Sequence, residues 1–293
     1  MLLKLIDNNS PVSFIINILL LLVTAVSYVF WAGASFNSLY IVNILSIAVT
    51  IYVLNVMSDR FHLFKELTYL SSFIFLLFTL NIQPVLFNTF IGLYLLLFVF
   101  YLFLVLTVYN QSDVKHISFN AGFVLGLLYV ANEYLLFFGL VLFLMLILSR
   151  SFYWREWLLA IIGIFLPVFY VKLFEYLGIS LPFMEKLNLS TFSLSSEVVR
   201  LYIGSSVLLF VLTLFYLGRK TVRKRNIYTA ILTALIVAVL IYFVFNIKWS
   251  MVFTIPPMAI LITHLYHNIK KQIFRWIILL YVIALSICSF VIQ

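Results

Sequence analysis

The sequence predicts a single all-α domain over residues 1–293, a polytopic bundle of transmembrane helices. Hydrophobic residues make up 66% of the chain and charged residues only 9%, and the mean hydropathy is +1.21. Soluble domains carry about 25% charged residues. With so few charges, most of the surface must face lipid rather than water. We therefore expect a multi-pass membrane protein.

Eleven apolar segments account for most of the chain. A helix needs about 20 apolar residues to cross the ~30 Å hydrocarbon core of a bilayer. The segments are 12–32, 38–57, 66–82, 85–108, 117–131, 134–149, 157–177, 197–217, 227–246, 249–267 and 274–292. The first is too long for the apolar region of a signal peptide, so we expect it to be retained. The fifth and sixth reach only about 22–24 Å. They are either full spans or a hairpin of half-depth helices, which gives about nine to eleven crossings.

Basic residues alternate between the two sides of these segments. The positive-inside rule places the side that is richer in Lys and Arg in the cytoplasm. One side holds 14 of the 18 basic residues, namely Lys4, Arg60, Lys65, Lys115, Arg150, Arg155, Arg219, Lys220, Arg223, Lys224, Arg225, Lys270, Lys271 and Arg275. The other side holds Lys172, Lys186, Arg200 and Lys248. We therefore expect a cytoplasmic N-terminus and an extracytoplasmic C-terminus.

Several residues inside the segments predict local packing. Gly122 and Gly126 form a GxxxG pattern, whose mechanism is close helix packing. Pro167 and the pair at 256–257 interrupt backbone hydrogen bonding, which predicts kinks that either line a cavity or are purely structural. All five tryptophans, Trp249 among them, fall near segment ends, as an interfacial aromatic belt requires.

Polar groups inside a bilayer are costly, so they are the first candidates for function. Asn132-Glu133 separates the two short segments at the outer apex of their hairpin. There Glu133 either lies below the headgroup level, where burial favours proton transfer, or is a solvated turn residue. Lys172 and Glu175 share one helical face, as an interfacial ion pair or as part of a site. The functional interpretation is an outer-face cavity with catalytic carboxylates at Glu133 and Glu175 and phosphate-binding cations at Lys172, Arg200 and Lys248.

The most basic loop, residues 219–225, separates the first eight segments from the last three. It suggests a subdivision into residues 1–218 and 226–293. The loop is either a cytoplasmic anchor or a docking patch for an acidic partner, lipid or polyprenyl phosphate. The residues of such a patch are Arg219, Lys220, Arg223, Lys224 and Arg225.

Composition and motifs exclude several classes of protein. The single cysteine, Cys288, excludes an intrachain disulfide and a cysteine-based zinc cluster. His264 and His267 are too few for a metal site and are interpreted as interfacial residues, so we expect no metal and no cofactor. Walker A, GxGxxG, HExxH and GxSxG motifs do not occur, which argues against an ATPase, a zincin and a lipase. The net charge of +9 is attributed to topology and to anionic lipid headgroups rather than to nucleic acid.

Residues 149–157, with the sequence SRSFYWREW, are followed by Gly163 and Pro167 in the next segment and preceded by residues 120–123, with the sequence NAGF. This combination resembles an uncharacterised family of bacterial polytopic membrane proteins. The resemblance implies a location in a bacterial cytoplasmic (inner) membrane. The layout is also similar to membrane glycosyltransferases that use polyprenyl-phosphate sugars. Those enzymes usually carry catalytic acids in a first outer loop, whereas residues 33–37 here contain no carboxylate.

Three functions from different classes follow as hypotheses. The first is a non-catalytic subunit or scaffold of a cell-envelope assembly or export machine, with other envelope membrane proteins as partners. The second is an enzyme or flippase that acts on a lipid-linked, polyprenyl-phosphate glycan precursor at the outer face. The third is a small-solute transporter, although the inverted repeats typical of transporters are not detectable in this sequence.

Overall fold

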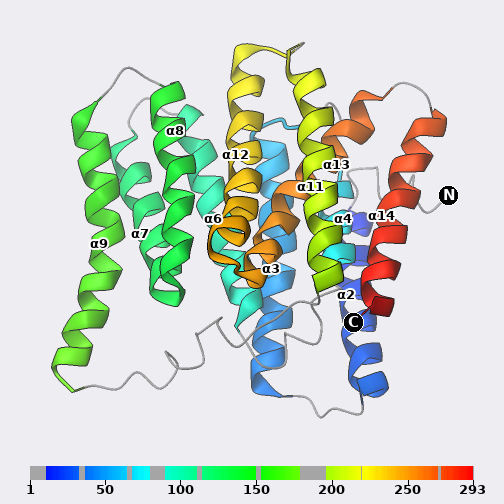
Figure 1. Ribbon diagram of the computed structural model, residues 1–293, viewed down its shortest axis with the longest axis horizontal. Helices are drawn as coiled ribbons and strands as arrows, with labels where there is room; N and C mark the ends of the chain where they lie inside the picture. Colours follow the sequence, from blue (N-terminus) through cyan, green and yellow to red (C-terminus); the bar gives the residue numbers. More distant parts are fainter. Residues whose placement is uncertain are drawn as a thin grey trace.

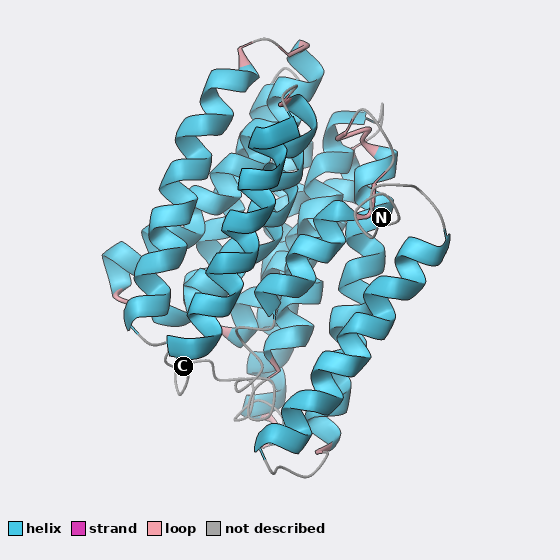
Figure 2. Cartoon of the chain, turned by 90° about the vertical axis from the view of Figure 1, so that its right-hand side faces the viewer, coloured by secondary structure: helices cyan, strands magenta, loops and turns pink. Residues whose placement is uncertain are grey.

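The computed structural model describes residues 11–32, 37–64, 68–79, 90–110, 114–149, 153–178, 196–218, 220–269 and 272–292. These residues form eleven α-helices, three 3-10 segments and no strand, which confirms the all-α prediction for this part of the chain. Figure 1 shows the helices standing roughly parallel, from α9 at one edge to α14 at the other, and Figure 2 shows their loops at the two ends of the bundle.

Each predicted apolar segment coincides with one helix or with a 3-10 segment that continues into a helix. The elements are α2 (Pro11–Ala32), α3 (Ser38–Arg60), α4 (Leu70–Thr79), α6 (Ile91–Thr107), η2 (Val108–Asn110), α7 (Lys115–Ala131), η3 (Glu133–Phe138), α8 (Gly139–Ser149), α9 (Trp154–Tyr176), α11 (Ser196–Leu217), α12 (Val222–Phe245), η5 (Lys248–Thr254), α13 (Ile255–Asn268) and α14 (Gln272–Ile292).

Five of the described helices are long and apolar enough to cross a membrane. They are Ser38–Arg60, Trp154–Tyr176, Val199–Leu217, Val222–Phe245 and Lys248–Asn268. Large apolar side chains also cover the outside of the bundle, and Leu45, Phe165 and Phe215 are 61%, 64% and 76% exposed. An apolar outer surface of this kind is stable in lipid and unstable in water. The described structure is therefore that of a membrane protein.

Contacts between helix ends gather the basic residues at one end of the bundle. The Arg60 guanidinium lies 5.3 Å from the ring centroid of Phe103, and Lys220 Nζ donates to Asn268 Oδ1 at 2.6 Å. Asn226 Nδ2 donates to the Leu148 carbonyl at 3.4 Å. We call this the basic end. Because successive helices run in alternating directions, their bounds assign each described Lys and Arg residue to one end of the bundle. The basic end holds eight of the eleven, namely Arg60, Lys115, Arg155, Lys220, Arg223, Lys224, Arg225 and Arg275.

The helix formed by η5 and α13 lies at the centre of the bundle. Every residue from 249 to 266 is buried, and α13 packs against α4, α11, α12 and α14. The prolines at 256–257 occupy the first positions of α13. They lie where the 3-10 segment η5 passes into α13, and the first turn of an α-helix tolerates proline because its N–H groups have no intrahelical acceptors. The kink predicted at these prolines stays a prediction.

Trp249 lies in this centre and is only 3% exposed, with its ring 6.0 Å from that of Phe253. The prediction that it belongs to an interfacial belt is wrong, because η5 brings the segment end into the bundle. Trp154 and Trp276 are 59% and 49% exposed at the beginnings of α9 and α14. These two rings have the exposure that an aromatic belt requires.

Helices α7 and α9 pack backbone against backbone, as the GxxxG pattern predicted. A Cβ atom built on Gly122 would lie 2.1 Å from the Ala160 carbonyl oxygen, and one on Gly163 would lie 2.4 Å from the Phe119 oxygen. A Cβ on Gly126 would lie 3.0 Å from ring carbons of Pro167. Pro167 is inside α9 and buried, so its ring fills the space that Gly126 leaves. Small residues allow such close approach between membrane helices.

Candidate functional site

A groove lies between α9 and the η3–α8 segment, with α7 behind it. Among the described elements α9 packs mainly along α7, and it meets α8 where Trp157 stacks on Phe143 at 5.0 Å between ring centroids. The space left between the two helices is a cavity of about 500 Å³. Its lining residues are Tyr129, Glu133, Leu136, Phe137, Gly139, Leu140, Phe143, Ile161, Ile164, Phe165 and Val168. We call it the apolar groove.

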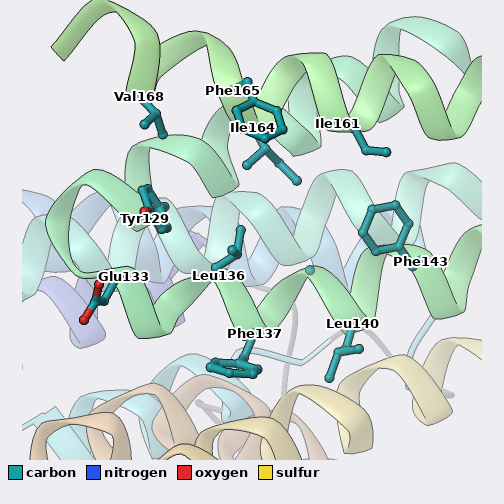
Figure 3. Close-up of a pocket in the computed structure, with 11 residues that line it drawn as sticks. Tyr129, Glu133, Leu136, Phe137, Leu140, Phe143, Ile161, Ile164, Phe165 and Val168 are labelled. Atoms are coloured by element: carbon teal, nitrogen blue, oxygen red, sulfur yellow. The ribbon is translucent and has the colours of Figure 1, made fainter. Parts of the chain in front are cut away.

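Figure 3 shows how these side chains are distributed. Ile161, Ile164, Phe165 and Val168 come from α9 on one side, Leu136, Leu140 and Phe143 come from the opposite side, and the Glu133 carboxylate lies at one end beside Tyr129. Phe165 and Leu140 are 64% and 56% exposed, so the groove opens on the outer surface of the bundle. Its volume is in the range of about 300–1,000 Å³ that is typical of small-molecule sites.

A second, polar pocket of about 370 Å³ adjoins the apolar groove. Its lining residues are Tyr129, Val130, Ala131, Asn132, Glu133, Val168, Val171, Lys172 and Glu175. Tyr129, Glu133 and Val168 line both cavities. The two spaces are therefore neighbouring parts of one site, with a long apolar body and a polar end.

The turn that carries Glu133 is held by specific contacts. Asn132 leaves the helical conformation, with φ −162° and ψ 131°, and its Oδ1 accepts from the Tyr134 N–H at 3.1 Å. This bond caps η3 in the usual manner of an asparagine N-cap. The Tyr134 and Phe137 rings lie 4.6 and 5.3 Å from that of Phe245 in α12. Glu133 is thereby fixed at a defined place next to the groove.

The rest of η3 is anchored to α6. Tyr101 is buried and its hydroxyl donates to the Phe138 carbonyl at 2.6 Å. The Phe138 and Phe98 rings lie 4.6 Å apart. This hydrogen bond satisfies a carbonyl at the junction between η3 and α8, where the helical pattern changes. The site is therefore built on a hairpin that is anchored to α6 and on the peripheral helix α9.

The charged groups of the polar end differ in their partners. Lys172 Nζ lies 2.7 Å from Glu175 Oε2, and the two side chains are 71% and 56% exposed. The ion pair expected from their spacing is thus confirmed, and at this exposure solvent screening leaves it little net effect on stability. Glu133 is exposed to the pocket. It makes no hydrogen bond or ion pair with another described residue.

The structure brings three of the five predicted outer-end site residues together. Glu133, Lys172 and Glu175 line the polar pocket. Arg200 is exposed near the beginning of α11, Lys248 is half-buried at the beginning of η5, and neither is among the lining residues. The convergence of Arg200 and Lys248 with the other three is therefore not seen. The catalytic and phosphate-binding roles of all five stay predictions.

The basic loop has a different setting. Lys220 donates to Asn268, and Arg223 and Arg225 are exposed at the beginning of α12. Lys224 is half-buried, and Arg219 lies outside the described residues. Helix α12, which follows the loop, packs against α8 as well as α13. The docking role of this loop stays a prediction.

Sequence reasoning missed the apolar walls of the site and one buried histidine. Tyr129 lies in the last turn of α7, and because the chain leaves the helical conformation at Asn132 the sequence spacing to Glu133 gave no signal of their proximity. His264 was expected at the interface but is 2% exposed. Its ring lies 3.9 Å from that of Tyr228 and it is hydrogen-bonded to Asn268. Among the residues described, no three His, Cys, Asp or Glu side chains are grouped to hold a metal ion.

Comparison with protein-family profiles, with curated proteins and with solved structures finds no match to this chain.

Proposed function

We propose that this membrane protein binds a lipid-linked substrate, with the hydrocarbon chain in the apolar groove and the headgroup at Glu133, Lys172 and Glu175. The observation that carries the proposal is the sharing of Tyr129, Glu133 and Val168 by an apolar and a polar cavity. A ligand that fills both must itself have a long apolar part joined to a polar part. A lipid-linked glycan precursor is a ligand of this form.

The physical setting supports recognition through the headgroup. Lipid chains are as apolar as the groove walls, so binding the chain gains little from the hydrophobic effect and depends on shape. Charged side chains near a bilayer are costly and therefore mark functional positions. Glu133 lies where the α7–α8 hairpin turns back, and Figure 1 shows this turn short of the level that α9 and α3 reach. The hydrocarbon chain of the lipid would thus position the ligand in the groove, while the charged side chains select its headgroup.

The proposal includes an orientation. With about eleven crossings in a bacterial inner membrane, the basic end faces the cytoplasm, because most of the described Lys and Arg residues lie there. The polar pocket then opens towards the outer face. That is the side on which the second hypothesis places an enzyme or flippase for polyprenyl-phosphate-linked precursors of the cell envelope.

The test is photo-crosslinking of the full-length protein with lipids that carry a diazirine in the chain. Ile161 and Ile162 form a matched pair, because both side chains are 43% exposed and only Ile161 lines the groove. Ile161→Trp should fill the groove and reduce labelling of α8 and α9 about tenfold, the effect of losing about 1.4 kcal/mol of binding. Ile162→Trp should leave labelling unchanged. Equal labelling of both variants would refute binding in this groove.

A further inference from the structure

The polar end of the site has an unbalanced set of charges. Two carboxylates, Glu133 and Glu175, and one ammonium, Lys172, line the pocket. The Lys172 ammonium lies 2.7 Å from Glu175, so these two charges largely compensate each other. The remaining charge is that of Glu133, which has no ion-pair partner among the described residues.

A headgroup that enters this pocket removes water from Glu133. A carboxylate that loses water is stable only when it gains a counter-charge or hydrogen-bond donors. A purely anionic headgroup brings a second negative charge towards it, whereas a protonated amine supplies both a positive charge and N–H donors. The free carboxylate therefore selects a ligand that carries a primary ammonium.

Donors for a phosphate are present in the same pocket. Lys172 has three N–H donors, of which Glu175 occupies one. The Asn132 side chain uses its oxygen to cap η3, which leaves its Nδ2 group as a donor beside Glu133. Both donors line the same pocket as Glu133. Phosphate and amine can thus be bound together.

We propose that the headgroup bound here is zwitterionic, a phosphoethanolamine group whose ammonium pairs with Glu133 and whose phosphate meets Lys172 and Asn132. The inference rests on the lipid-binding part of the proposed function, and it names a phosphoethanolamine headgroup in place of a polyprenyl-phosphate one. A trimethylated amine has no N–H to donate, so phosphocholine fits Glu133 less well. Phosphatidylglycerol and polyprenyl phosphate lack the amine altogether.

The experiment compares diazirine lipids with identical chains and ethanolamine, choline or glycerol headgroups, together with polyprenyl phosphate, on the full-length protein in mixed micelles. Labelling of the groove by the ethanolamine lipid should exceed labelling by the glycerol lipid about fivefold, the ratio expected for one solvent-accessible ion pair. Glu133→Gln should abolish this preference but keep the labelling of the groove by the chain. Tyr176→Lys changes the net charge equally at an 88% exposed position outside both cavities, and it should keep the preference.

The outcomes separate the inference from the function on which it rests. Equal labelling by the ethanolamine and glycerol lipids, or stronger labelling by polyprenyl phosphate, overturns the zwitterionic headgroup while supporting lipid binding. Absence of groove labelling by every lipid refutes the proposed function and this inference with it. The comparison of lipids on the unmodified protein decides the first question even when Glu133→Gln fails to fold.

Discussion

Replacing Gly122 by alanine should separate α7 from α9. The new Cβ would lie 2.1 Å from the Ala160 carbonyl oxygen and 2.9 Å from the carbonyl carbon. Van der Waals contact needs about 3.4–3.5 Å, so the two backbones must move apart by more than about 1 Å. Both atoms belong to the backbone, and no side-chain rotation relieves the clash.

The expected cost follows from overpacking and lost contact. Forcing a methyl group into a filled space costs about 1–3 kcal/mol, and a gap of about 1 Å forfeits up to about half of the dispersion energy at the neighbouring contacts. Gly163 and Gly126 are the other points of close approach and would lose contact together with Gly122. We expect the upper part of this range, about 3 kcal/mol, and a fall in melting temperature of about 5–10 °C.

The assay is thermal unfolding in mild detergent, followed by size-exclusion chromatography with fluorescence detection. Gly204→Ala is the matched control, because a Cβ at Gly204 in α11 meets no heavy atom within 4 Å. Alanine is favoured over glycine inside a helix by up to about 1 kcal/mol, so this variant should melt at the same or a slightly higher temperature. Equal melting of Gly122→Ala and the unmodified protein would show that the helices are not in backbone contact.

Three further predictions concern other parts of the molecule. In a Cys288→Ser background, a cysteine at Arg225 should react with impermeant reagents only from the cytoplasm and one at Tyr176 only from outside, because basic loops stay inside; the reverse pattern would invert the topology. Changing Arg223, Lys224 and Arg225 to Gln should leave insertion intact but weaken co-purification of an acidic partner, and higher salt should weaken the binding of the unmodified protein in the same way because it screens these charges; co-purification unchanged by the substitutions and by salt would remove the docking role. Tyr101→Phe should lower stability by about 1–2 kcal/mol in a detergent melt, because the Phe138 carbonyl loses its buried donor, and an unchanged melting temperature would show that water replaces the hydroxyl.

The positions of the helices were predictable because they depend on local properties. Each of the eleven apolar segments contains one α-helix, in some cases joined to a 3-10 segment. A long apolar segment in lipid can satisfy its backbone hydrogen bonds only as a helix. The error at Trp249 has a tertiary cause, and so does the helix boundary at residues 256–257. The sequence shows that prolines lie within an apolar run, but only the packed bundle shows that α13 begins there and that η5 is buried.

The candidate site was predictable only in its charged part. Glu133, Lys172 and Glu175 are conspicuous because charges are rare in the apolar segments. The alternating directions of the helices predicted that all three lie at the same end of the bundle. The apolar groove gave no signal, because its leucine, isoleucine and phenylalanine side chains look like those that face lipid. The groove exists because α8 and α9 both pack on α7 while meeting each other mainly at Phe143 and Trp157. The separation of α8 and α9 beyond this contact results from how the helices pack, and neither segment's sequence predicts it.

Charged and amide side chains identify the candidate site better than serine and threonine do, because hydroxyl groups find hydrogen-bond partners within their own helix. Many buried hydroxyls donate to a carbonyl one turn earlier in their own helix, as Thr50, Thr213 and Thr263 do at 2.6–2.8 Å. Such bonds satisfy the hydroxyl locally and leave it unavailable to a ligand. A glutamate has no hydrogen to donate to a backbone carbonyl, so the Glu133 carboxylate must find donors elsewhere. Residues 249–266 at the centre of the bundle are buried, so under the proposed function such donors come from a lipid headgroup at the edge of the bundle.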